Sequence, residues 1–448
     1  MRNRLKILVY WCLLALTCLF ATHGTASAQE DPLGGSVKAL QAAFESDKRV
    51  RNLLNGDEQA KKDDARDLKS AETAANWYIW RITHPKTKED SISKFQSDFA
   101  DKVKEMMEKV ISTGKPRNNR VFIDMFGRAL VTSMKKVLER DIKRDPTTMI
   151  HAVMMLPTMA KLKQDDVGDY LLELVKQGKT HDVFRLYALK ALKEYMPITG
   201  HDNLDIDSKA VMLGLLRDAK YVDVLSRYIT RPVNVNGLSD GEIAAIHFLR
   251  REAITSLGHA GAPAVLALRK PLKLGKVGMD ATGRKELEIE GLVAPTLFRV
   301  LANDLPLAPT IQEKLEAVHG VCRIKSTNLS DYNADLAVYL VGRTLQEFVS
   351  EYNKDWANFA ALGPKKTLSV VAWKTEARLL DASLGLLKAN GGKGSAQLEA
   401  AAKPILANIG KYDRPDNAKV ADLNAFVAQL PTVNLNAFKN IKSPIKLK

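Results

Sequence analysis

The sequence predicts an all-α protein, an irregular α-solenoid in which successive helix pairs stack on one another. Three observations predict it. From about residue 37 to residue 429, apolar residues recur at intervals of three and four, the period of a helix with one buried face. Helix start and stop signals interrupt this pattern regularly. Strand signals are sparse: Pro232–Gly237 alternates, but it is short and begins with proline, so we expect an extended loop.

Two stretches carry the capping-box pattern that starts a helix, Ser239–Glu242 and Thr310–Glu313. In each, the hydroxyl side chain and the glutamate three residues later satisfy backbone N–H groups that the first helical turn leaves free. Glycine marks the expected ends of helices, where a left-handed residue is needed. These glycines are residues 114, 178, 391 and 410. Between such signals we expect about 14 to 17 helices, most of about 12 to 20 residues.

A loose pattern recurs four times: a cation, an alanine three residues later, then a small residue and a leucine or valine. The third copy is looser than the first two, and the fourth keeps only the second half. The anchoring alanines are residues 188, 253, 317 and 382, spaced 65, 64 and 65 apart. Small residues where helices cross let two backbones approach to about 8 Å. We therefore expect these four helices to use this face for packing, with chance alignment of amphipathic helices as the alternative.

Two segments carry the pattern best, Asp182–Leu192 and Arg250–Gly258, the second followed by Ala260–Ala264. They resemble the second helix of HEAT repeats and its turn, and the HEAT-like repeats of the phycobilisome-lyase type. In that family a basic residue precedes an alanine, Ala-Leu-Gly closes the helix, and proline opens the next one. The resemblance implies a helical-repeat fold and a binding surface, because these repeats have no invariant chemistry.

The resemblance is best over residues 180–200 and 241–268. It is fainter over 305–325 and 375–390, and it is not visible before about residue 116. The spacing of about 65 residues exceeds the roughly 40–47 of a single HEAT repeat. We therefore expect an irregular array, with enlarged loops or an extra helix in each period.

Residues 1–28 are expected to be a secretory signal peptide. They contain three cations and no acid, an apolar run of 14 residues over Ile7–Phe20, and the small residues Ala26-Ser27-Ala28. The alternative, an uncleaved anchor, is disfavoured because a bilayer span needs about 20 residues. No other apolar run approaches that length. The mature chain is then expected to begin at Gln29, with no membrane span, and to be exported, periplasmic or secreted.

The rest of the chain divides by composition into three regions. Residues 29–115 are expected to form an N-terminal helical cap, residues 116–428 the HEAT-like solenoid, and residues 429–448 a basic tail. The cap contains Trp77 and Trp80, three residues apart and so on one face of a helix. We expect this pair to bury the cap against its neighbours; the alternative is a ligand platform.

The chain is basic, with 67 Lys and Arg against 52 Asp and Glu. Part of this charge lies in the loop 269–285, and the tail adds four lysines. Fixed positive charge gathers anionic partners, although a solvated surface is the alternative. Aromatic residues do not alternate with these cations, which argues against nucleic acid. The possible polyanion-binding residues are Arg269, Lys270, Lys273, Lys276, Arg284 and Lys285.

Motifs of known catalytic or metal chemistry are missing from the sequence. It has no H-E-x-x-H, no paired C-x-x-C and no G-x-S-x-G. The glycine-rich stretch Asn390–Ser395 follows a helix and lacks the first glycine of a phosphate loop, so we expect a linker. His247 is expected to be structural, and His201–Asp207 a loop without calcium. Cys322, the one cysteine after residue 28, is expected to be buried, which excludes an intramolecular disulfide.

These features predict an exported scaffold or adaptor that binds a macromolecular partner, most simply a protein, without catalysis, cofactor or metal. One alternative is an envelope protein that docks anionic cell-surface polymer through its basic face. A second is an enzyme of unknown type in a helical fold, which a pocket with converging polar groups would favour.

Overall fold

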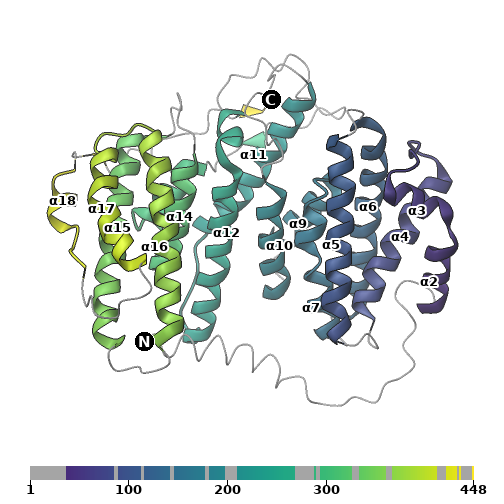
Figure 1. Cartoon of the computed structure of the whole chain (residues 1–448), viewed down its shortest axis with the longest axis horizontal. Coiled ribbons are helices and arrows are strands. Elements are labelled where there is room, and N and C mark those ends of the chain that lie inside the picture. Colours follow the sequence, from purple (N-terminus) through teal and green to yellow (C-terminus); the bar gives the residue numbers. More distant parts are fainter. Residues whose placement is uncertain are drawn as a thin grey trace. The chain divides into compact units, whose positions relative to one another are not determined.

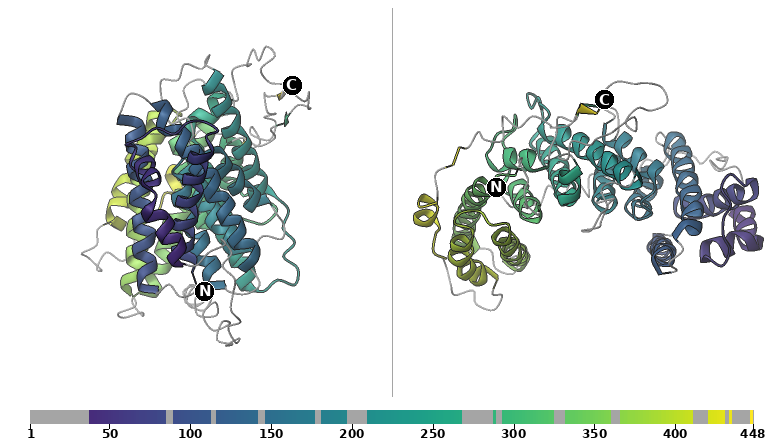
Figure 2. Two further views of the ribbon diagram at one scale, coloured as in Figure 1. Left: turned by 90° about the vertical axis from the view of Figure 1, so that its right-hand side faces the viewer. Right: turned by 90° about the horizontal axis from the view of Figure 1, so that it is seen from above.

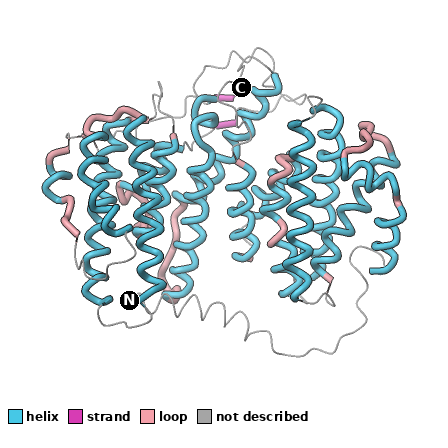
Figure 3. The backbone as a smooth tube through the Cα atoms, viewed as in Figure 1, coloured by secondary structure: helices cyan, strands magenta, loops and turns pink. Residues whose placement is uncertain are grey.

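The computed structural model describes residues 37–84, 89–112, 116–141, 146–176, 181–196, 209–267, 287–288, 293–324, 332–359, 366–410, 420–430, 433–434 and 446–447. Most of these residues are helical, so the predicted all-α class is confirmed (Figure 3). Besides the loops, the described residues contain one antiparallel pair of two-residue strands, β1 (Leu287–Glu288) and β2 (Lys446–Leu447). The expected signal peptide 1–28, the basic loop 269–285, most of the tail 429–448, and His201–Asp207 lie outside the described residues.

The helices of the chain divide between two compact units, Met1–Tyr195 with Ser239–Glu242, and Met196–Leu238 with Ile243–Lys448. In the first unit α4 packs on α6 and also contacts α2, α3 and α5, while α10 packs on α8 and α9 (Figure 1). Two of the helices expected to form the cap, α4 and α5, therefore pack directly on α6. The helices of this unit are α2 (Val37–Ser46), α3 (Lys48–Asn55), α4 (Ala65–Thr83), α5 (Glu89–Ser112), α6 (Pro116–Asp141), α7 (Pro146–Val153), α8 (Leu156–Ala160), α9 (Asp165–Lys176) and α10 (Asp182–Tyr195).

Aromatic side chains hold the N-terminal helices of this unit together. Trp80 is buried and its ring lies 4.2 Å from that of His84, while the half-buried Trp77 stacks on Phe44 of α2 at 5.7 Å between ring centroids. Tyr78, between them, is buried with its ring 5.2 Å from that of Phe99. The tryptophan pair therefore buries the first helices against their neighbours, as predicted, and offers no open platform for a ligand.

The second unit repeats one packing relation along the chain. Helices two places apart contact each other, as α11 does with α13, α13 with α15, and α14 with α16. Seen from above, these helices appear nearly end-on, so they run roughly parallel or antiparallel (Figure 2). The helices are α11 (Lys209–Thr230), α12 (Asp240–Ala267), α13 (Val293–Leu301), α14 (Ile311–Arg323), α15 (Ala334–Phe359), α16 (Lys366–Ala389), α17 (Ser395–Gly410) and α18 (Asn424–Ala428).

The prediction of a turn after Gly258 is wrong, because α12 continues through Gly258 and Pro263 to Ala267. Gly258 serves close packing and not chain reversal. A Cβ on Gly258 would lie 2.8 Å from the Cα of Gly320 on α14. The expectation that small residues permit close approach of helices is thus confirmed for Gly320, and its partner is Gly258.

Three of the four copies of the repeated pattern are buried as expected. Their anchoring alanines, residues 188, 253 and 317, are inaccessible to solvent. The cations three residues earlier are also buried, and each pairs with a carboxylate: Arg185 with Asp182, Arg250 with Glu313 and Lys314 with Glu347. A buried cation needs such a partner, so the pattern marks an ion pair as well as a helix crossing.

The prediction that the fourth copy of the pattern packs inward is wrong. Ala382 is exposed and Leu386 retains 48% of its accessible surface, while the neighbouring Ser383 and Leu384 are buried. The face of α16 that packs inward is therefore displaced from the one that the pattern selects. The displacement leaves that side of the helix in solvent.

The crossing of α12 and α14 gives a first testable prediction. Gly258→Ala places a methyl group against the backbone of Gly320, and we expect it to cost about 1–3 kcal/mol of unfolding free energy. Gly385→Ala is the matched control on α16, because a Cβ there meets nothing within 4 Å. Relief of glycine's backbone entropy should stabilise that variant by about 0.5–1 kcal/mol. Urea unfolding followed by circular dichroism measures both, and equal stabilisation by the two substitutions would contradict the close crossing.

Candidate functional site

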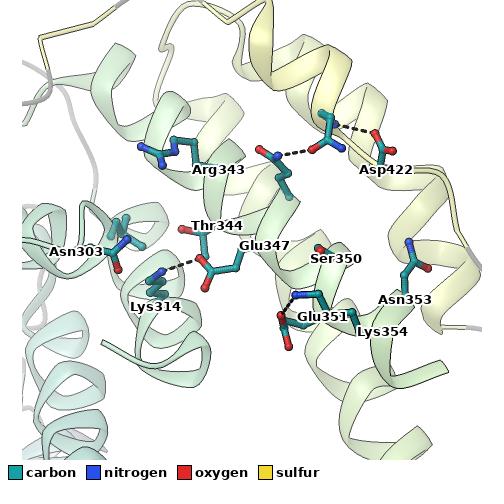
Figure 4. Close-up of a pocket in the computed structure, with 13 residues that line it drawn as sticks. Asn303, Lys314, Arg343, Thr344, Glu347, Ser350, Glu351, Asn353, Lys354 and Asp422 are labelled. Atoms are coloured by element: carbon teal, nitrogen blue, oxygen red, sulfur yellow. Dashed lines mark hydrogen bonds and ion pairs between the residues drawn. The ribbon is translucent and has the colours of Figure 1, made fainter. Parts of the chain in front are cut away.

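A polar groove of about 560 Å³ opens on the second unit (Figure 4). The end of α13 and its following turn, the first turn of α14, the middle of α15 and the start of α18 contribute to its walls. The lining residues are Leu301, Asn303, Lys314, Arg343, Thr344, Gln346, Glu347, Ser350, Glu351, Asn353, Lys354, Asp422 and Asn424.

Helix α15 supplies most of this lining because its two faces differ in polarity. Arg343, Glu347, Ser350 and Lys354 are spaced by four, three and four residues, so they follow one stripe of the helix. The opposite face is apolar and packs into the unit. Its buried residues include Val341, Leu345, Phe348, Val349 and Tyr352. The hydrophobic face thus fixes the helix, and the polar stripe is presented to the groove.

Lys314 connects the wall of the groove to the core. Its side chain is only 6% exposed, and its Nζ lies 2.6 Å from Oε2 of Glu347, which is 41% exposed. An ammonium group that leaves water requires a counter-charge at contact distance. The pair therefore joins the first turn of α14 to α15, and it fixes the Glu347 carboxylate at the groove surface.

Arg343 is the cation of the groove that remains available. It is exposed, its guanidinium lies 5.9 Å from the ring centroid of Tyr339, and no carboxylate of the described residues lies within ion-pair distance. Lys354, by contrast, pairs with Glu351 at 2.7 Å. The lining as a whole carries three cations and three acids, so the groove has both signs of charge and no net charge.

Residues 420–424, before and at the start of α18, form the third wall and are clamped to α15. The side-chain amide of Asn353 donates to the carbonyl of Val420 at 3.1 Å and accepts from its N–H at 3.0 Å. Gln346 donates to the side chain of Asn424, and Asp422 accepts from the backbone N–H of Asn424 at 3.0 Å. This wall therefore depends on a few polar side chains.

A Ser–His–Glu arrangement lies between α14 and α16. His319 places Nδ1 2.7 Å from Oγ of Ser383 and Nε2 2.9 Å from Oε1 of Glu376. The distances match those of a nucleophile and its base, but Ser383 is buried in the interior of a helix. Backbone N–H groups there are bonded within the helix and cannot stabilise an oxyanion. The three residues therefore bridge two helices.

A second buried cluster joins α12 to the start of α14. Glu313 is inaccessible to solvent; its carboxylate accepts from Nε of Arg250 at 2.5 Å and from the N–H of Thr310 at 2.7 Å. His247 Nδ1 lies 2.9 Å away. Burial alone would raise the pKa of Glu313, but these hydrogen bonds outweigh it and lower the pKa to about 2. The predicted structural role of His247 and both capping boxes are confirmed.

Two further residues or stretches singled out in the sequence have structural roles. Cys322 is buried, as expected, and burial raises its thiol pKa to about 12, which removes thiolate reactivity at neutral pH. Asn390–Ser395 is the predicted linker: Gly391 and Gly394 have positive φ, and the N–H of Lys393 donates to Asp335 at 2.8 Å. Among the residues that the structure describes, no cluster of histidine, cysteine or carboxylates suits a metal ion.

The six possible polyanion-binding residues, Arg269, Lys270, Lys273, Lys276, Arg284 and Lys285, lie outside the described residues. No sequence motif marks the groove residues. Their only signal is the polar stripe of residues 343–354, and every surface helix has such a stripe. No helix in the described ranges is long and apolar enough to cross a bilayer.

The buried Glu313 cluster predicts a pH dependence. The folded pKa of about 2 lies below the ordinary value of 4.5, so the carboxylate's contribution is fully present above about pH 4.5 and is lost as the pH falls toward 2. Glu313→Gln should remove this part of the pH dependence. It should also cost about 3–5 kcal/mol near neutral pH, because Arg250 loses its counter-charge. Urea unfolding of both proteins between pH 7 and pH 2.5 tests this, and parallel pH profiles would contradict it.

The clamp on α15 predicts a local effect. Asn353→Ala leaves the N–H and carbonyl of Val420 without these partners, at a cost of about 1–3 kcal/mol. We expect backbone amides in residues 420–430 to exchange hydrogen at least about tenfold faster, measured by mass spectrometry. Lys354→Ala is the neighbouring control, because its ion pair with Glu351 is exposed and solvent screening leaves it little effect on stability. The same exchange rate in both variants would exclude a clamp at Asn353.

Comparisons of the chain with protein-family models, curated proteins and solved structures find no match. The resemblance to HEAT-like repeats therefore rests on the sequence segments quoted for it, and it stays a prediction.

Proposed function

We propose that the chain is an exported, non-catalytic scaffold or adaptor that binds a segment of a partner protein in the groove along α15. The proposed fold is an irregular α-solenoid of HEAT-like helix pairs with an N-terminal helical cap. The observation that carries the proposal is the groove itself, with its mixed charge and its continuous polar stripe from Arg343 to Lys354.

The dimensions of this stripe suit a polypeptide. Lys354 lies eleven positions after Arg343 on the helix, which corresponds to about 16 Å. A strand of about five residues covers the same length. Such a segment presents N–H donors and carbonyl acceptors along its backbone, and the lining offers both kinds of partner in Asn303 and Ser350.

The charge of the groove distinguishes the proposal from polymer docking. An anionic polymer needs a surplus of cations, whereas here Glu347, Glu351 and Asp422 balance the three cations. Arg343 adds a specific anchor, because a guanidinium forms paired hydrogen bonds with a carboxylate. A polypeptide with at least one acidic side chain or a free carboxyl terminus meets these requirements best.

The packing of the second unit supports the solenoid part of the proposal. Helices two places apart contact each other, and buried cations recur at the spacing of the sequence pattern. In repeat proteins each unit touches mainly its neighbours, which leaves a long surface for partners. Export is supported by the N-terminal pattern of cations, apolar run and small residues.

A capture experiment tests this function. The chain, Arg343→Glu and a control, Lys136→Glu, are immobilised and exposed to the organism's own envelope fraction at low salt and at about 0.5 M salt. Lys136 is an exposed residue of α6 in the first unit, so the control makes the same charge change away from the groove. We expect one discrete protein at both salt concentrations, with at least about tenfold less on Arg343→Glu.

Two outcomes would contradict the proposal. Material retained only at low salt would favour docking of anionic polymer through the basic segment 269–285, because salt screens long-range attraction between exposed charges. Equal capture by Arg343→Glu and Lys136→Glu would remove the groove as the binding site.

A further inference from the structure

Helix α16 exposes a regular apolar seam. Leu379 and Leu386, seven residues apart on this helix, are 47% and 48% exposed. Two other large apolar side chains of the described residues are similarly exposed, Leu68 on α4 and Phe248 on α12. The seam continues in both directions at alternating intervals of three and four residues. Its exposed members are Ala372, Thr375, Leu379, Ala382, Leu386 and Ala389.

This seam is additional to the face that α16 uses within its own unit. Ala377, Leu380, Leu384 and Leu387 are buried, and α16 packs against α14 and α17 (Figure 1). A helix with an apolar face toward its unit and a second one in water leaves the second face able to bury area against another surface. The interval of three and four over six positions is that of a coiled-coil seam.

We infer that the seam joins two copies of this chain through antiparallel pairing of α16 with α16. The distribution of large and small residues along the seam favours a second copy. Both leucines occupy one set of alternate positions, and the other set holds only alanine and threonine. In antiparallel pairing each layer combines one position of each set, so every leucine meets a small residue.

One register uses the whole seam. Leu379 packs on Ala382 of the second copy, Leu386 on Thr375, and Ala372 on Ala389, and the two-fold axis repeats each layer. Parallel pairing would instead place leucine on leucine and alanine on alanine, which leaves alternate layers overfilled and empty. The self-complementary pattern is that of a two-fold interface, in which the same patch serves both subunits.

The residues beside the seam are compatible with this pairing. In the same register the position of Glu376 pairs with that of Ser383, which is buried in its own unit, and the position of Arg378 pairs with that of Gly385, so no like charges are opposed. A Cβ added to Gly385 would meet nothing within 4 Å in its own chain, so this side of the helix is open to a second helix. Glu376 also keeps its contact with His319 in its own unit.

Sedimentation of the full chain from about 1 to 100 µM tests the pairing. We expect dimerisation in this range and at least about a tenfold rise in the dimer dissociation constant for Leu379→Glu/Leu386→Glu. Leu68→Glu, at a 37% exposed leucine of α4, is the matched control. Thermal melts establish that both variants fold. A chain that stays monomeric throughout, or a dimer that the double variant leaves unchanged, would overturn the inference.

Cysteine cross-linking tests the orientation. In a background with Cys12→Ser and Cys18→Ser, Ala372→Cys/Ala389→Cys should form disulfide-linked dimers under mild oxidation. Residues 372 and 389 of one copy are about 26 Å apart along the helix, so they cannot bond to each other. Ala372→Cys alone should form no dimer. Efficient linkage of that single variant would show parallel pairing and overturn the antiparallel arrangement.

Discussion

The buried carboxylate of Glu313 is the constraint on which the second unit depends. It accepts from Arg250 of α12 and from the backbone at Thr310, and Arg250 also donates to the carbonyl of Leu307 at 2.8 Å. A charge taken out of water is tolerated only when these partners are all in place. The loop before α14, the first turn of α14 and the middle of α12 must therefore form together. Lys314, the next residue, then reaches the groove from a fixed base.

The sequence patterns that proved predictive are those in which one local interaction decides the outcome. The two capping boxes form as expected, because a hydroxyl and a glutamate three residues apart can satisfy their own helix start. Gly320 lies at a helix crossing, because only a residue without a side chain allows contact with Gly258. The cations before the anchoring alanines are buried. Arg185 has its acidic partner, Asp182, three residues earlier in the chain. The partners of Arg250 and Lys314 lie on other helices, so no local sequence signal predicts them.

The features that the sequence could not predict depend on how a helix is rotated within its unit. Ala382 fits the repeated pattern, yet α16 buries the neighbouring Ser383 and Leu384 instead. Ser383 forms a hydrogen bond with His319. Neighbouring positions differ by about 100° around a helix, so a shift of the inward face by one residue reverses which side chains are buried. The groove is also a tertiary feature. Its lining comes from four elements, and a polar stripe on α15 alone does not distinguish a binding surface from an ordinary solvated face.

The orientations of two helices give this unit two surfaces of different chemistry. Helix α16 exposes the leucine seam, and α15 presents its polar stripe to the groove. The seam would bind a second copy by burying apolar area and by packing large residues on small ones. The groove would bind a peptide through charge and hydrogen bonds. A dimer through the seam would present two grooves. A partner with two binding segments could then engage both, and tethering of the second segment raises apparent affinity by about 10²–10⁴ without any new contact, provided that its linker spans the grooves. Self-association and partner binding would in that case be coupled, and disruption of the seam would weaken capture of such a partner while leaving the affinity of each groove unchanged.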